Sequence, residues 1–163
     1  MTPLLLTTGE FERSLDAFPL EYQAMLDHHE VIAGRSPFDG IRVDAADLRR
    51  ACEAHARGHL IHLRQGWMQA AGHREALAGL IEQSSAPLRA LLTNVARLHN
   101  TNAATDDELA SFAANTIGMP ADLVRAVLAL QSQPEGRMRL AARMGDYLTA
   151  CERLWAFVDD WRA

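Results

Sequence analysis

Residues 44–72 restrict how this chain can fold more than any other stretch, because they predict one long, uninterrupted helix. Asp44 can accept hydrogen bonds from the free amides of the first turn, and Val43 and Leu48 occupy the two positions of a hydrophobic staple. Gly72 follows the last periodic residue, where a left-handed residue commonly ends a helix. At about 1.5 Å per residue the helix would be roughly 40 Å long, so we expect it to be the spine of the domain.

The overall composition is that of one globular domain without a strongly basic surface. The chain has 163 residues, of which 48% are hydrophobic and 23% charged, which is enough to bury a core. A formal charge of −5 excludes a protein whose whole surface binds nucleic acid, although a local stripe of arginines, the only basic residue type besides histidine, remains possible. The apolar run at residues 4–6 is too short for a signal peptide or a membrane span, so we expect a cytoplasmic protein.

The predicted helix at 44–72 has an apolar face and an arginine-bearing face. Successive residues turn by about 100°, which places on the apolar face Leu48, Cys52, Ala56, Leu60, Leu63, Trp67 and Ala70. Arg50, Arg57 and Arg64 recur every seven residues on nearly the opposite side, and Glu53 lies one turn before Arg57, where we expect the two to form an ion pair. The arginines could bind phosphate through paired hydrogen bonds or form a solvated face with weak ion pairs, and we favour the second interpretation.

The two cysteines point to structural burial and not to a disulfide. Cys52 and Cys151 lie on apolar faces of predicted helices and are about a hundred residues apart. We expect both thiols to be reduced and buried.

Residues 1–43 form an irregular segment that precedes the helical bundle. Thr8 can begin a short helix that ends before Pro19, because proline lacks an amide donor and restricts the residue before it. Residues 20–26 fit a strand as well as a helix, and periodicity does not decide between them. Residues 31–32 and 41–43 are short extended candidates on either side of a turn-rich stretch.

The remainder of the chain predicts helices joined by short connections. A seven-residue apolar repeat covers 74–99, where Pro87 should kink the helix or restart it with Ser85 as a cap. Thr105 and Glu108 form a capping box that begins a pair of short helices, and a last helix runs to the C-terminus. We therefore expect an all-α, antiparallel, four-helix-bundle-like fold over residues 44–163.

Three histidines on the predicted helix at 44–72 are candidate ligands. His55, His59 and His62 have the i, i+4, i+7 spacing at which imidazole nitrogens can hold a metal, but no further ligand has a suitable spacing. We favour polar residues that border the core or a dimer contact, and expect no metal and no cofactor. Arg50 to His55 and Arg57 to His62 each satisfy R-x4-H, which resembles the active-site motif of HEPN ribonucleases.

Several short segments together resemble the later part of bacterial nucleotidyltransferase-domain proteins. They are SLDAFPLEY at 14–22, HEVIAG at 29–34 followed by Pro37-Phe38, Cys52-Glu53, RGHL at 57–60 and LRQG at 63–66. In that family a catalytic α/β domain precedes a helical bundle similar to the substrate-binding domain of kanamycin nucleotidyltransferase and to HEPN domains. The resemblance covers nearly the whole chain and implies the same kind of bundle.

The catalytic motifs of that family are missing from this sequence. It contains neither the Gly-Ser turn nor the Asp-x-Asp pair that would hold magnesium and the nucleoside triphosphate. Residues 18–26 resemble the end of the catalytic domain, which makes Glu21 a remaining acid. Because one carboxylate cannot assemble a two-metal site, the resemblance implies a non-catalytic module and not an enzyme.

The leading functional hypothesis is a helical module that binds a nucleotide or small-molecule substrate, or a catalytic nucleotidyltransferase subunit. Its expected contact residues are Glu21, Glu53, Arg57, Gly58, Arg64 and Gly66. The two glycines each weaken a helix interior by up to about 1 kcal/mol, which suggests close approach of another backbone or a ligand.

Two other hypotheses remain open. One is a HEPN-like ribonuclease that uses Arg50, His55, Arg57 and His62. The other is a structural homodimer without a ligand, and we expect the bundle to be dimeric in any case.

Overall fold

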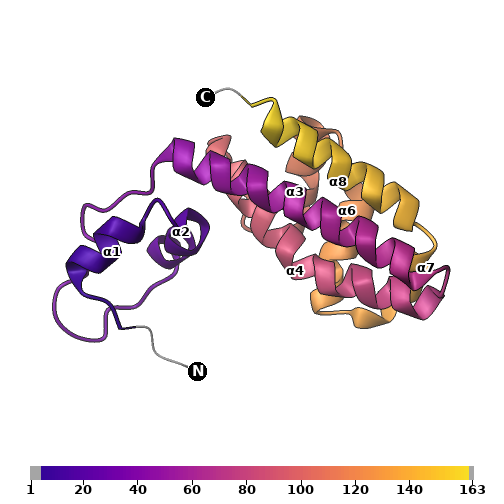
Figure 1. Ribbon diagram of the computed structural model, residues 1–163, viewed down its shortest axis with the longest axis horizontal. Coiled ribbons are helices and arrows are strands. Elements are labelled where there is room, and N and C mark those ends of the chain that lie inside the picture. The colour runs from indigo at the N-terminus through magenta and orange to yellow at the C-terminus, as the bar shows by residue number, and fades with distance from the viewer. Residues whose placement is uncertain (1–4, 162–163) are drawn as a thin grey trace. The chain divides into compact units, whose positions relative to one another are not determined.

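The computed structural model describes residues 5–161, which form an all-helical structure (Figure 1). Residues 5–161 contain no β-strand, so 20–26 belongs to a helix and the extended candidates at 31–32 and 41–43 lie in irregular chain. None of the helices in this part of the chain combines the length and apolarity needed to cross a membrane. The chain divides between Ala51 and Cys52 into two compact units, each with its own internal contacts.

The first unit contains two short helices joined by an aromatic cluster. Helix α1 (Thr8–Ser14) begins at a capping box between Thr7 and Glu10, and α2 (Pro19–Asp27) begins at a proline whose missing amide is not needed there. The Phe11 ring meets the Tyr22 ring edge-on at a centroid distance of 4.7 Å, and the Ser14 and Tyr22 hydroxyls are 2.6 Å apart. These contacts give the segment a small core of its own.

Helix α3 (Ala45–Ala70) begins and ends as the sequence predicts. The Asp44 carboxylate accepts from the amides of Ala46 at 2.8 Å and Asp47 at 3.3 Å, and Gly72 has a left-handed φ of 83°. The expected apolar face is buried with one exception, because the Trp67 side chain is 45% exposed. The assignment of Trp67 to the core was therefore wrong, although its angular position on the helix is correct.

The second unit, Cys52–Ala163, completes the bundle with the rest of α3 and the helices that follow it. Their bounds are α4 (Arg74–Leu98), α5 (Asp106–Phe112), a π-helical turn (Ala113–Ile117), α6 (Ala121–Leu128), single 3-10 turns at Ala129–Gln131 and Pro134–Gly136, α7 (Arg137–Ala141) and α8 (Met144–Asp159). The Thr105–Glu108 capping box is confirmed at the start of α5. The expected last helix is divided into α7 and α8 by a turn at 142–143.

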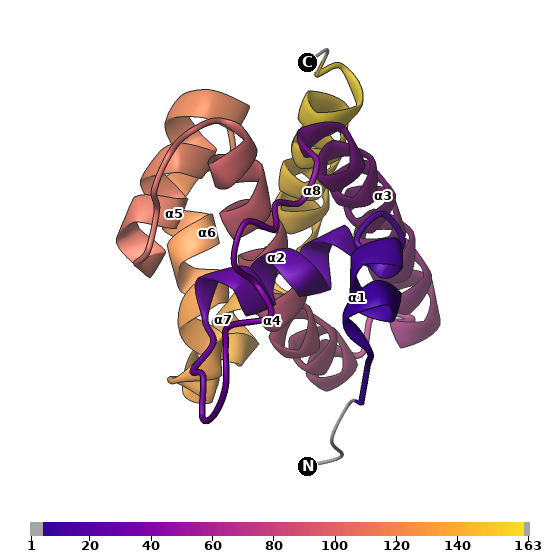
Figure 2. The ribbon, with the colours of Figure 1, turned by 90° about the vertical axis from the view of Figure 1, so that its left-hand side faces the viewer.

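Helix α4 is more enclosed than α3. Figure 2 shows α4 in the middle of the second unit, with α5, α6 and α7 on one side and α3 and α8 on the other. Buried residues lie around most of its circumference, and they include Ala78, Ile81, Ser85, Leu88, Leu92 and Val95. The sequence suggested α3 as the spine from its length alone, but enclosure depends on the number of neighbours that surround a helix.

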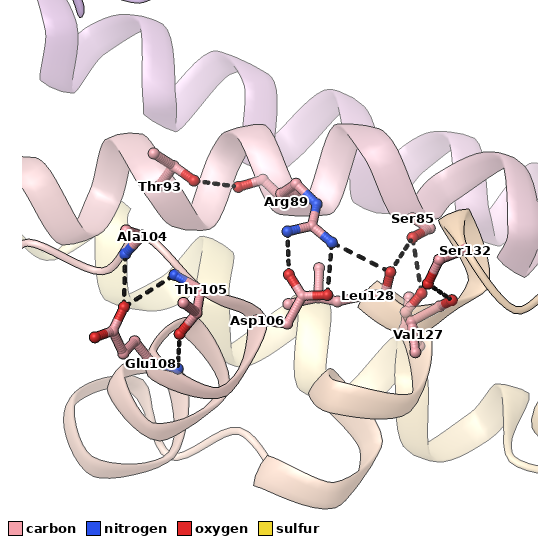
Figure 3. Close-up of polar contacts among 11 residues, drawn as sticks. Ser85, Arg89, Thr93, Ala104, Thr105, Asp106, Glu108, Val127, Leu128 and Ser132 are labelled. Carbon is pink, nitrogen blue, oxygen red and sulfur yellow. Dashed lines mark hydrogen bonds and ion pairs between the residues drawn. The ribbon is translucent and has the colours of Figure 1, made fainter.

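Polar side chains on α4 bond to the end of α6 (Figure 3). The last carbonyls of a helix have no partner within the helix. The Ser85 hydroxyl donates to the Val127 carbonyl at 2.7 Å, so Ser85 does not cap a restarted helix after Pro87, and α4 continues through both residues. One Arg89 nitrogen donates to the Leu128 carbonyl at 3.3 Å. These bonds bring side-chain donors of α4 to carbonyls in the last turn of α6.

Arg89 also joins α4 to the start of α5. Its guanidinium forms a two-pronged ion pair with the Asp106 carboxylate, with one Nη2–Oδ2 distance of 2.7 Å (Figure 3). Both side chains are about one-third exposed, so water screens the pair only partly. One arginine therefore fixes the positions of α5 and of the α6 terminus against α4.

We predict that Arg89→Met lowers the free energy of unfolding by about 1–3 kcal/mol, because Asp106 loses its ion-pair partner and the Leu128 carbonyl loses one of its donors. Arg125→Met is the matched control, since Arg125 pairs with Asp107 at a more exposed position and its loss should cost less than about 1 kcal/mol. Urea unfolding followed by far-UV circular dichroism measures both values. Equal losses for the two variants would contradict the role assigned to Arg89.

Candidate functional site

Between Ala54 and Met68, the outermost stripe of α3 is uncharged and partly apolar. Helix α3 forms an outer edge of the second unit (Figure 2), and within residues 54–69 those that point most directly outward are Ala54, Gly58, Ile61, Gln65 and Met68. All five are exposed, Ile61 by 44% and Met68 by 73%. A solvated helix face normally carries charged and polar residues, so this stripe is a candidate contact surface. We call these five residues the outer stripe.

Basic residues border the outer stripe on both sides. Helical geometry places Arg57 and Arg64 along one edge and His55 and His62 along the other, and all four are exposed. Arg64 donates to Glu152 of α8 at 2.6 Å, whereas Arg57 forms no ion pair with any residue among 5–161, so the expected pair between Glu53 and Arg57 was wrong. Residues 54–69 include no aspartate or glutamate. Arg57 therefore carries the uncompensated positive charge at this border.

The two glycines of α3 have different surroundings. A Cβ atom added at Gly66 would lie 2.6 Å and 2.7 Å from the two Leu80 methyl carbons, so Gly66 allows α3 to pack closely on α4. A Cβ atom added at Gly58 would meet nothing within 4 Å. Packing inside the bundle therefore explains why residue 66 is a glycine, but it does not explain why residue 58 is one.

His59 points away from the outer stripe into a buried chain of hydrogen bonds. Its Nε2 atom is 3.2 Å from the Tyr147 hydroxyl, which is 2.9 Å from the Ser84 hydroxyl. Ser84 donates to the Ile81 carbonyl at 2.7 Å, so Ser84 accepts from Tyr147 and Tyr147 accepts from His59. This order requires a proton on His59 Nε2.

Burial determines the protonation of this chain. Burial, assisted by the neighbouring His55 and His62, lowers the pKa of His59 to about 4, and burial raises the pKa of Tyr147 well above its usual value. His59 is thus neutral near pH 7. His55 and His62 are exposed, so the three rings do not converge, and no group of three potential metal ligands occurs within residues 5–161.

The cysteines match the sequence prediction. Cys52 and Cys151 are free and buried, and burial raises the pKa of each thiol to about 12. Both therefore remain protonated and have little nucleophilic character.

The other predicted site residues lie apart from the outer stripe. Glu53 is half-buried on α3, and Arg50 pairs with Asp47 one turn away. Glu21 is exposed in the first turn of α2, within the first unit. It borders a largely apolar pocket of about 420 Å³ whose lining residues are Leu6, Glu10, Ser14, Phe18, Glu21, Tyr22 and Met25.

A polar hollow near the α4–α5 connection was not foreseen. Two adjoining hollows of about 320 and 440 Å³ share residues 101–103. Thr93 and Asn100 line the first, and Asn115 and Thr116 of the π-helical turn line the second. The polar run Asn100-Thr101-Asn102, which follows the end of α4, was the available signal in the sequence.

We predict opposite outcomes for alanine at the two α3 glycines. Gly58→Ala should raise the free energy of unfolding by about 0.5–1 kcal/mol, because the helix gains a better helix former and no atom lies in its way. Gly66→Ala should be neutral or destabilising, because the new methyl group displaces the Leu80 side chain. Urea unfolding of both variants tests this order, and a more stable Gly66→Ala would contradict it.

His59 should make the protein less stable in acid. Its pKa of about 4 in the folded chain lies below the unfolded value of 6.5, so the unfolded chain binds more protons between these values. Stability should fall as pH drops from about 6.5 to about 4, by at most about 1.4 kcal/mol per pH unit, and this contribution should be fully present above pH 6.5.

His59→Gln should remove this part of the pH dependence while it keeps a donor toward Tyr147, whereas His55→Gln at an exposed position should retain it. Urea unfolding across the pH range compares the two variants with the native chain. The same pH slope in the native chain and in His59→Gln would reject the assignment.

Comparison with known proteins leaves the family of this chain open. No protein-family model matches it, and no curated protein or solved structure is significantly similar to it.

Proposed function

We propose that this chain is a non-catalytic helical module that binds a catalytic nucleotidyltransferase subunit through the outer stripe of α3. The exposure of Ile61 and Met68 within the uncharged outer stripe carries the proposal. Contiguous exposed apolar residues with a polar border are typical of protein–protein contact surfaces.

The shape of the surface favours a protein over a small molecule. Ligand pockets are concave and surround most of the ligand, whereas the outer stripe is one side of a single helix. Gly58 adds space for the backbone of a partner, and its lower helix propensity has no explanation in the packing of the bundle. Arg57 can pair with an acidic group of the partner at the edge of the contact.

The choice of partner rests on the sequence resemblance. Two of the segments that resemble nucleotidyltransferase-domain proteins, 57–60 and 63–66, lie on the part of α3 that carries the outer stripe. Glu21 is a single carboxylate, so the partner would supply the Asp-x-Asp pair and bind the nucleotide. This chain would supply the helical contact and help to place the substrate.

The proposal is tested by binding to a separately encoded nucleotidyltransferase that carries an Asp-x-Asp motif, beginning with the product of a neighbouring reading frame. Isothermal titration calorimetry with the full chain should show binding, and Met68→Ser should weaken it about tenfold or more, because Met68 lies in the contact. Met138→Ser is the matched control, since Met138 is an exposed methionine on α7, and it should bind normally.

Three results would contradict the proposal: no binding, AMP transfer by the chain alone, or cleavage of labelled RNA that is lost in His62→Ala. The last result would support the HEPN-like alternative. The geometry of α3 does not favour this alternative. Arg57 and His62 lie on opposite borders of the outer stripe, so the helix holds their side chains apart.

A further inference from the structure

The outer stripe has the spacing of a helix-docking seam. Its members, Ala54, Gly58, Ile61, Gln65 and Met68, follow one another at intervals of four, three, four and three residues. Alternating intervals of three and four keep residues on one line along a helix and are the pattern through which two helices pack together. The stripe covers about 21 Å of α3, or roughly two heptads.

The stripe also tapers from small to large side chains. Ala54 and Gly58 occupy its N-terminal half, whereas Ile61 and Met68 stand out at its C-terminal half. The open space at Gly58 allows a large side chain of a second helix to reach the α3 backbone. In knobs-into-holes packing a side chain of one helix fits between side chains of the other, and the recess at Gly58 could receive such a side chain.

The charge beside the outer stripe indicates which kind of partner helix can bind there. Arg57 forms no ion pair with an acidic side chain among residues 5–161, although Glu53 lies one turn before it, and His55 and His62 line the opposite edge. Glu152 compensates Arg64, so Arg57 dominates the border. A second copy of this face would bring basic borders together, and nucleic acid would require several free cations. A helix with acidic residues beside its apolar seam is complementary to this surface.

We propose that the outer stripe is a docking seam for one acidic amphipathic helix of a partner protein. The inference deepens the proposed function, on which it rests only for the choice of face. It adds the manner of recognition, namely helix against helix with Gly58 as the point of closest approach and Arg57 as the charge that selects acidic flanks.

Two synthetic peptides of about three heptads test the proposal directly. Both carry leucine at the seam positions, and they differ only at the flanking positions, which are glutamate in one peptide and lysine in the other. Fluorescence anisotropy with the full chain should show binding of the glutamate peptide about tenfold or more tighter than that of the lysine peptide, and added salt should reduce the difference.

Matched variants separate the seam from the rest of the surface. Ile61→Ser and Met68→Ser should each weaken the glutamate peptide about tenfold, whereas Met138→Ser on α7 should have no effect. Arg57→Glu should reverse the preference toward the lysine peptide, and Arg139→Glu, at an exposed position of α7, should leave it unchanged. The substituted positions are exposed, and far-UV circular dichroism verifies that each variant is folded.

Several outcomes would overturn the proposal. These are the absence of binding at about 100 µM peptide, equal binding of both peptides, or binding that Ile61→Ser does not alter. A dimer in light scattering that Ile61→Ser converts to monomer would assign the stripe to a second copy of the chain.

The same variants distinguish this inference from the proposed function. Binding of the glutamate peptide without binding of the catalytic subunit would reject the proposed function and retain the seam. Binding of the subunit without selectivity between the peptides would reject the seam and retain the proposed function.

Discussion

The bundle depends on the satisfaction of polar groups around the enclosed helix α4. The buried side of α4 covers more than half of the helix circumference, and each polar side chain on that side needs a protein partner because water does not reach it. The Ser84 hydroxyl forms a hydrogen bond with Tyr147 of α8, and the Ser85 hydroxyl donates to the Val127 carbonyl at the end of α6. Arg89 meets both α5 and α6. These directional bonds specify where the other helices lie, which apolar packing alone specifies less sharply.

Helix α3 contrasts with α4 because only one side of it is used by the bundle. Its inner side contributes Leu60, Leu63 and the His59 bond to Tyr147, all within the second unit. Its outer stripe exposes Ile61 and Met68 and lacks the charge that a solvent-facing stripe usually has. The helix therefore has a structural side and a side available for binding. The proposals for partner and docking mode both concern the second side.

Gly58 and Gly66 lie on the same helix but have different surroundings. Both cost helix propensity, and the sequence offers the same explanation for both, namely the close approach of something else. At Gly66 the approaching group is Leu80 of the same chain, whereas at Gly58 nothing in the described structure approaches. Gly58 is the position where stability and binding should conflict, because alanine there strengthens the helix and fills the recess.

The sequence by itself determined the helical class and most helix ends. The sequence correctly predicted the Asp44 cap, the Thr105–Glu108 capping box and the left-handed Gly72. Capping acts between residues within one turn, so it depends on the local sequence alone. Residues 20–26 could not be assigned in the same way, since a short apolar run fits both periods and its packing decides.

Only the tertiary structure decided which helix is central, which glycine is packed, and which histidine is buried. Length suggested α3 as the spine, but the neighbours of α4 enclose it more completely. His55, His59 and His62 are equivalent in the sequence, and His59 differs because Tyr147, 88 residues away, lies beside it. Trp67 is exposed despite its correct helical phase, because phase gives the direction of a side chain and not the presence of a neighbour. Burial and partnership depend on residues distant in the chain, and local periodicity contains no information about them.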